Sequence, residues 1–292
     1  MSWQAAIGFS ILASIITILV QRGYSLKSLV PDTFPPATSY LLGVMPIGII
    51  IGLSLPHGIH WGWWVGLLLI ICAATMAISY WINFKAVKLM PVAPYQTMTR
   101  FTNILTIALG WLLLGEKLNL YQLSGAALLL LAAALAAWAP IRRIKQAEQR
   151  LHWQSVTLTL IAASLLGISL VTEKAILGHA QVGGVLIFGW GAQTLAMLLL
   201  ALKDFNRTNF RKYKWYELRW SWLMGLANGI SGAFYVYALN KSNSISIITA
   251  LTAIALPLTV FGAHIFLKER DNSKLILLSL TLCFVGLLVF VA

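Results

Sequence analysis

The sequence predicts an all-α membrane protein in which ten transmembrane helices form two inverted five-helix repeats. The first observation is composition: the 292 residues are 59% hydrophobic and 10% charged, against about 25% charged in an average soluble domain. The second is a series of long uncharged runs along the whole chain. The third is a charged motif written twice, with Glu116 and Glu269 separated by 153 positions.

Composition also excludes other classes of protein. The net charge of +13 comes from short basic clusters between apolar runs, which is unlike the single basic patch of a nucleic-acid-binding domain. Both cysteines, Cys72 and Cys283, lie inside apolar runs, so we interpret them as small core residues without a disulfide. The first 20 residues lack a basic start and a small-residue cleavage site, and they predict a first membrane helix rather than a signal peptide.

Each membrane helix is predicted from a run of about 20 apolar residues, the length that crosses a bilayer. Residues 33–84 carry no Asp, Glu, Lys or Arg and are long enough for two helices, split at "LPHGIHWG". The other predicted spans are 2–21, 89–115 (interrupted by Arg100), 118–139, 153–173, 182–202, 219–240, 244–267 and 274–292. All should be helical because no backbone polar group can stay unpaired in hydrocarbon.

The two halves are predicted as residues 1–140 and 151–292, joined by the basic segment "APIRRIKQAEQR" (139–150). "LGEKLN" at 114–119 resembles "LKERDN" at 267–272, and "ASIITI" at 13–18 resembles "ASLLGI" at 163–168. Because each half holds an odd number of spans, the second half enters the membrane from the opposite side. This is the inverted repeat found in many secondary transporters.

Basic residues are distributed unequally between the two sides of this topology. Seventeen Lys and Arg residues fall in loops on the side reached after the first helix, and three fall on the other side, Lys117, Lys174 and Lys241. Cytoplasmic loops carry the excess of Lys and Arg. The charge pattern therefore predicts that both termini lie outside the cytoplasm.

The repeated motif predicts helix caps. Glu116 ends the fourth helix and Asn119 stands where an N-cap of the fifth would be, while Glu269 and Asn272 occupy the same places before the last helix. Asn is a favoured N-cap, and a carboxylate is stabilised near a helix start. The alternative is that both glutamates bind a coupling ion. A charge at the end of a span is much less costly than one at its centre, which favours caps.

Polar residues recur at helical spacing on several spans and predict a cavity. The first helix carries Ser10, Ser14, Thr17 and Gln21 on one face. The residues predicted to bind substrate are Ser79, Asn83, Gln96, Arg100, Asn103, Trp190, Gln193, Asn228 and Tyr235. The alternative is that such residues are ordinary contacts between packed membrane helices, and that Trp190 faces lipid.

Charges inside the spans constrain the solute. Arg100 is the one basic residue well inside a predicted span; it either contacts substrate, or extends to the nearer interface or pairs structurally. Glu173, next to Lys174 at the end of a span, is expected to be interfacial. With no acid expected at mid-membrane, exchange of lipophilic cations for protons is disfavoured, and an anionic, zwitterionic or neutral solute is favoured.

The segment "FKAVKLMPVAPYQTMTRFTNILTIALGWLLLGEKLNLYQLSGAALLLLAAALA" (84–136) resembles the drug/metabolite transporter superfamily, EamA type. It has that family's aromatic residue and alanine, short polar joint, helix, Gly-Glu-basic turn and glycine-led helix. The second half is a poorer copy, with Lys268 in place of the usual glycine, although Pro257 falls where the family often has proline. The resemblance extends to the ten-helix pattern of the chain. It implies export or exchange through a central cavity, and it implies cytoplasmic termini, which conflicts with the charge pattern.

These observations together predict a secondary transporter of small organic metabolites in a bacterial inner membrane, working by alternating access as a monomer or homodimer. Membrane lipid is an expected partner, whereas nucleic acid, a cofactor and a metal ion are not expected. An enzyme would need a nucleophile, metal ligands or paired acids at depth, and the sequence shows no such set. The remaining alternative is a lipid-handling or accessory membrane protein without solute transport.

Overall fold

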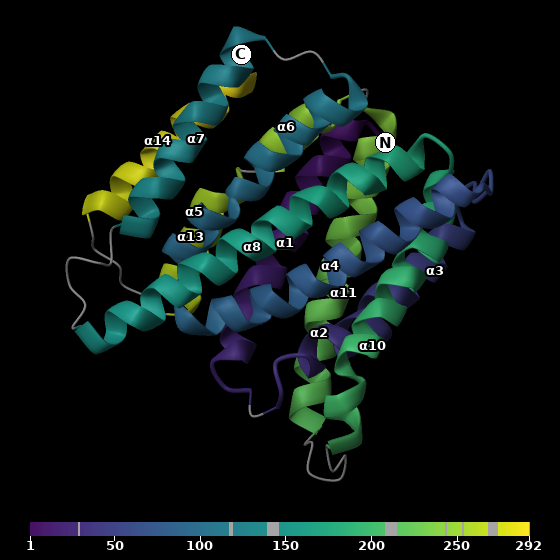
Figure 1. The fold of residues 1–292 in the computed structure, drawn as a ribbon, viewed down its shortest axis with the longest axis horizontal. Helices are drawn as coiled ribbons and strands as arrows, with labels where there is room; N and C mark the ends of the chain where they lie inside the picture. Colours follow the sequence, from purple (N-terminus) through teal and green to yellow (C-terminus); the bar gives the residue numbers. More distant parts are fainter. Residues whose placement is uncertain are drawn as a thin grey trace.

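The computed structural model describes residues 1–28, 30–116, 119–138, 146–207, 215–242, 244–252, 254–267 and 274–291. These residues form helices joined by short connections, and they contain no β-strand, only an isolated bridge between Ile59 and Ala180 (Figure 1). This agrees with the predicted all-α class.

The helices of the first half are α1 (Trp3–Ser25), α2 (Phe34–Ser39), the π-helical turn η1 (Tyr40–Val44), α3 (Met45–Leu53), α4 (Trp63–Leu89), α5 (Val92–Thr99), α6 (Phe101–Leu114) and α7 (Leu120–Trp138). Those of the second half are α8 (Gln146–Leu177), α9 (Val182–Gly184), the π-helical turn η3 (Val185–Gly189), α10 (Trp190–Arg207), α11 (Trp215–Lys241), α12 (Ile245–Thr252), α13 (Ala255–Phe266) and α14 (Lys274–Val291). Several helices extend beyond the predicted spans, among them α8, which continues past residue 173 to Leu177.

Among the described residues, six helices are long and apolar enough to cross a membrane. They are Trp3–Ser25, Phe34–Leu53, Trp63–Leu89, Pro94–Leu114, Trp153–Leu177 and Val182–Phe205. Large apolar side chains on their outer faces are exposed, as at Leu12, Ile16 and Ile70. Such faces suit lipid rather than water.

Two kinds of irregularity recur in both halves. The π-helical turns η1 and η3 interrupt the second helix of each half, and Met45 N–H bonds back to the Tyr40 carbonyl just before Pro46, which has no N–H to donate. The fourth helix is divided at Arg100 into α5 and α6, and the ninth is divided between Thr252 and Ala255 into α12 and α13. Thr99 and Thr252, the last residues of α5 and α12, are 153 positions apart, the same separation as the two motifs.

The halves are interleaved. Helix α4 packs along α8, α1 along α11 and α7 along α14 (Figure 1), and each pair joins one helix from each half. The approach of η1 to α11 is so close that a Cβ on Gly43 would lie 2.3 Å from the Gly225 carbonyl carbon. Glycine is therefore needed at this crossing, as at other close helix contacts in membranes.

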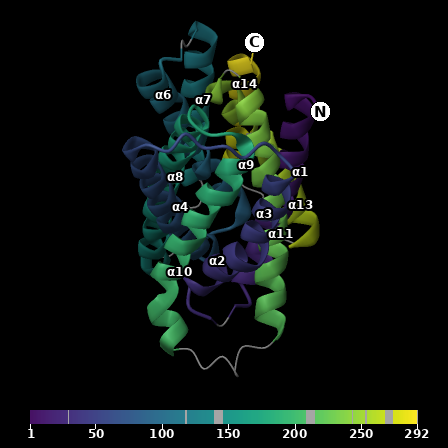
Figure 2. The same ribbon diagram turned by 90° about the vertical axis from the view of Figure 1, so that its right-hand side faces the viewer.

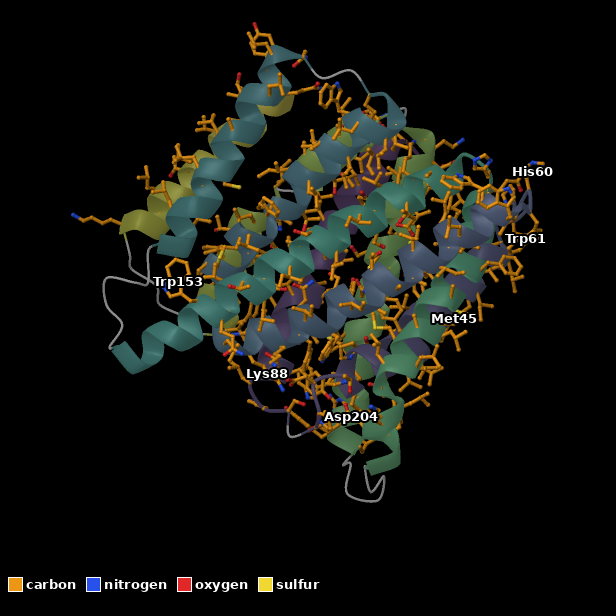
Figure 3. All side chains as sticks on the ribbon, viewed as in Figure 1. Met45, His60, Trp61, Lys88, Trp153 and Asp204 are labelled. Atoms are coloured by element: carbon orange, nitrogen blue, oxygen red, sulfur yellow. The ribbon has the colours of Figure 1, made fainter. Side chains whose placement is uncertain are left out.

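Several parts of the chain can be assigned to one or the other end of the helix bundle. Figure 2 shows the N and C termini toward the same end. Figure 3 places Lys88 and Asp204 toward the opposite end from His60 and Trp61. Lys88 there pairs with Asp32.

Candidate functional site

A cavity of about 280 Å³, lined by both polar and apolar side chains, lies between the two halves. Its polar lining comes from α1, η1, α4, α5, α6, α8, α10, α11 and α12, and comprises Ser10, Ser14, Thr17, Gln21, Tyr40, Tyr80, Asn83, Tyr95, Gln96, Thr99, Arg100, Thr102, Asn103, Glu173, Trp190, Gln193, Asn228, Ser231, Tyr235 and Thr252. Ligand cavities of drug-sized molecules measure roughly 300–1,000 Å³. This cavity therefore suits a small solute.

The polar face predicted on the first helix forms one wall. Ser10, Ser14, Thr17 and Gln21 all line the cavity. Where α1 meets α11, the Ser231 hydroxyl donates to the Ser10 carbonyl at 2.9 Å, and the two hydroxyl oxygens are 3.3 Å apart. The polar face of α1 thus lines the cavity and also contacts another helix. These are the two interpretations that the sequence left open.

Arg100 lies at the break between α5 and α6, with 8% of its side chain exposed. Its Nε donates to the Gln96 carbonyl at 3.4 Å, one terminal nitrogen to the Gln96 side-chain oxygen at 3.0 Å, and the other to the Thr252 carbonyl at 3.2 Å. A guanidinium has five N–H donors. The geometry therefore leaves donors on Arg100 for a ligand, while its existing bonds fix its direction.

The short helix α12 is held at both ends by the fourth helix. At its C-terminal end, Arg100 donates to Thr252 and the Asn103 side-chain amide donates to the Thr249 carbonyl at 3.1 Å. At its N-terminal end, the Glu116 carboxylate accepts from Ile245 N–H at 2.6 Å and Ser246 N–H at 3.2 Å. These contacts place a cation near the helix C-terminus and an anion near its N-terminus, as the helix dipole favours.

Glu116 is therefore a cap of a different helix from the one predicted. Its carboxylate also accepts from the hydroxyls of Ser244, at 2.9 Å, and Ser246. It reaches them because Gly115 has φ +68°, in the left-handed region that glycine adopts readily. Sequence reasoning assigned Glu116 to the helix that follows it in the chain, whereas the N–H groups in reach belong to α12 of the other half.

Asn119 lies where the sequence placed it, immediately before α7. Its side-chain oxygen accepts from Gln122 N–H at 2.8 Å, and the Gln122 side chain accepts from Asn119 N–H at 2.9 Å. This is a reciprocal capping box. The corresponding residues of the second motif, Glu269 and Asn272, lie outside the described residues.

Glu173, which the sequence did not place among the site residues, lies in the cavity. Its side chain is 4% exposed and lines the cavity beside Trp190. The reason is that α8 continues to Leu177, so Glu173 lies about 6 Å from the helix end at 1.5 Å per residue. Lys174 points elsewhere: its ammonium donates to the carbonyls of Leu239 at 2.9 Å and Ser242 at 3.0 Å.

Tyrosines and amides form the rest of the lining. Tyr80 donates to the Asn228 side-chain oxygen at 2.9 Å, and Tyr95 to that of Asn83 at 3.1 Å. The rings of Tyr40 and Tyr80 meet edge to face with centroids 5.2 Å apart. These bonds orient the phenols and amides, so the lining is pre-organised.

Of the nine residues predicted to bind substrate, the cavity brings together Asn83, Gln96, Arg100, Asn103, Trp190, Gln193, Asn228 and Tyr235. Ser79 is not among the lining residues, because its hydroxyl faces α8 and donates to the Ala162 carbonyl at 2.8 Å. Trp190 and Gln193 are 4% and 2% exposed, so Trp190 does not face lipid.

Sequence reasoning missed Glu173, Tyr40, Tyr80, Tyr95 and Thr252. Tyr80 precedes Asn83 by three positions, which puts it on the same helical face as a predicted site residue. That spacing was a usable signal. No such spacing pointed to Tyr40, because the π-helical turn that begins at this residue changes the helical phase.

Comparison with known proteins finds a family match in the first half of the chain. Residues 3–138 match the model of the EamA-like transporter family. This part of the chain is therefore similar to that family. The match confirms the resemblance to the drug/metabolite transporter superfamily.

The fold extends to the whole chain. A solved structure titled only "Crystal structure of protein" shares 18% sequence identity, with a TM-score of 0.69, over 98% of this chain and 97% of that chain. No match was found among curated proteins. The likeness of residues 3–138 to a family of transporters and the six apolar helices of the described residues together indicate an integral, multi-pass membrane protein.

Proposed function

We propose that this protein is a secondary transporter that exports or exchanges a small organic metabolite across a bacterial inner membrane by alternating access. The observation that carries the proposal is the cavity with many polar side chains in its lining, to which helices of both halves contribute. Substrate sites at the interface of repeats, formed by discontinuous helices, are typical of such transporters. No cofactor is needed for this activity, and the unit is a monomer or homodimer.

The alternating movement would follow from two inverted repeats, residues 1–140 and 151–292. The paired π-helical turns and the breaks after Thr99 and Thr252 support this arrangement. Rocking of one repeat against the other would expose the cavity first to one side of the membrane and then to the other.

The cap made by Glu116 would act as the closure at one end. It joins the end of α6 to the start of α12, which belong to different halves.

The test is solute flux into proteoliposomes that contain the purified protein. Thermal stabilisation by a panel of metabolites would first select a ligand, because a solute that binds the folded state stabilises it. We expect saturable flux of the selected radiolabelled solute that excess unlabelled solute suppresses, with protein-free liposomes as the control. Lipid movement between leaflets without solute flux would favour the lipid-handling alternative and overturn the proposal.

A further inference from the structure

Two opposite charges face the same cavity without neutralising one another. Arg100 and Glu173 both line it, at 8% and 4% exposed. No ion pair involves either side chain in the part of the chain that the structure describes. Burying an unpaired charge is costly, so a cavity that keeps one of each sign is suited to a ligand that supplies both countercharges.

The surroundings of Arg100 suit an anionic group. Its existing bonds go to the Gln96 and Thr252 carbonyls and to the Gln96 amide, none of which carries a charge. Tyr95 and Gln96 line the cavity next to it. The remaining donors of the guanidinium form the fork that binds a carboxylate or phosphate in two places.

The surroundings of Glu173 suit an ammonium group. Tyr40, Tyr80, Tyr235 and Trp190 are its neighbours in the cavity. The nearest basic residue along the chain, Lys174, is engaged with carbonyls at the end of α11. A carboxylate among aromatic rings attracts a cation through both its charge and the faces of the rings.

We propose that the cavity binds a small zwitterion, with its anionic group at Arg100 and its ammonium group at Glu173. This inference rests on the proposed transport function and specifies its substrate class. It narrows the choice among anionic, zwitterionic and neutral solutes that the sequence left open. The cavity volume of about 280 Å³ suits a small solute, such as one of amino-acid size.

The binding experiment uses the full-length protein in detergent and measures thermal stabilisation. The probes are the standard α-amino acids and a series of longer ω-amino acids beginning with β-alanine, which vary the distance between the charges. The best binder is then compared with its N-acetyl derivative, its methyl ester and the doubly blocked compound. We expect the free zwitterion to bind at least about tenfold more tightly than either singly blocked form, as the loss of a charge-assisted contact predicts.

Matched variants test which residue binds each charged group of the zwitterion. Glu173→Gln should remove the preference for the free amine while keeping the preference for the free carboxylate, and Arg100→Gln should do the reverse. Asp32→Asn is the control, because it removes an acid that lies outside the cavity in a pair with Lys88; it should leave both preferences unchanged. A variant that binds the doubly blocked compound as the wild type does is folded, so its altered preferences report on charge.

Several results would overturn the inference. If no zwitterion of the panel stabilises the wild type while another solute is transported, the substrate class is wrong although the transport function holds. If Glu173→Gln keeps the affinity for the zwitterion but abolishes flux driven by a proton gradient, the carboxylate carries protons and does not bind substrate. If no solute is transported at all, the proposed function itself fails.

Discussion

Glu116 and Glu173 are both acids near the ends of membrane helices, yet their surroundings differ completely. Glu116 accepts hydrogen bonds from two backbone N–H groups and two hydroxyls at the start of α12. Glu173 faces the cavity beside Trp190 and forms no ion pair with any described residue. The sequence presents both in the same way, as a single acid beside a lysine.

The difference teaches how a buried acid can be sorted into a structural or a ligand-binding role. A carboxylate whose acceptor sites are occupied by fixed donors stabilises the fold and has little capacity left for a ligand. A carboxylate in a cavity without a countercharge keeps that capacity. By the same criterion Lys174 has a structural role, because it donates to two carbonyls.

The first prediction concerns which side of the membrane carries the Glu116 cap, and its outcome is all or none. The excess of Lys and Arg in the loops reached after α1 places both termini, and with them the end of α6 at Glu116, in the periplasm. A fluorescent protein that matures only in the cytoplasm, fused after Ala292, should stay dark. Alkaline phosphatase, which is active only outside, should be active in the same position. The opposite pair of signals would place the termini in the cytoplasm, as the family resemblance implies.

The next largest effect is expected at Arg100, which has both a structural and a ligand-binding part. Arg100→Gln should lower transport by about thirtyfold or more, since losing one partner of a buried charge contact costs roughly 2–5 kcal/mol. Arg100→Lys keeps the charge but loses the fork, and should retain part of the transport. Initial flux rates at equal amounts of inserted protein measure this. Normal flux in Arg100→Gln would show that the side chain only supports Thr252 and Gln96.

Most of the fold was predictable because membrane helices leave strong signals. Long apolar runs predicted membrane helices, and six helices among the described residues are long and apolar enough to cross a membrane. The polar spacing on α1 and α5 placed their faces toward the cavity. Glu173 could not be placed in this way. Its depth depends on where α8 ends, and the helix continues four residues past the predicted end. Helix ends are poorly determined by periodicity.

Contacts between the two halves could not be predicted from the sequence either. The partner of Glu116 is set by how close α6 comes to α12. That approach depends on Gly110, where a Cβ would lie 3.1 Å from the Ile245 side chain. A motif beside a helix start suggested a local cap, but the N–H groups it satisfies are about 130 residues away in the chain.

A matched pair of substitutions tests the comparison of the two acids directly. Glu116→Gln should lower the free energy of unfolding by about 1.5–3 kcal/mol, the range for hydrogen bonds to a charged group. Glu173→Gln makes the same chemical change and should leave stability almost unaltered while changing ligand preference. Thermal unfolding of the purified variants without ligand gives both values. Equal destabilisation of the two variants would show that Glu173 is also held by the fold.

A smaller loss is expected at the local cap. Asn119→Ala removes the side-chain oxygen that accepts from Gln122 N–H, and losing an N-cap costs about 1 kcal/mol. Asn119→Asp serves as the control because it retains a capping oxygen. Transport per folded molecule should be unchanged in both variants. A change in transport for Asn119→Ala at normal stability would extend the functional region to the start of α7.

The smallest effect is expected at Ser79, the predicted site residue that lies behind the cavity wall. Its hydroxyl donates to the Ala162 carbonyl and accepts from the Asn83 side chain at 3.3 Å. Ser79→Ala should cost about 1 kcal/mol of stability, the typical value of one such hydrogen bond. Asn83→Ala, by contrast, removes an amide that lines the cavity and should weaken ligand binding more than Ser79→Ala. Titration of the selected ligand against both variants measures the loss of affinity in each. If Ser79→Ala weakens binding as much as Asn83→Ala does, the part of α4 that affects the solute includes the face that packs on α8.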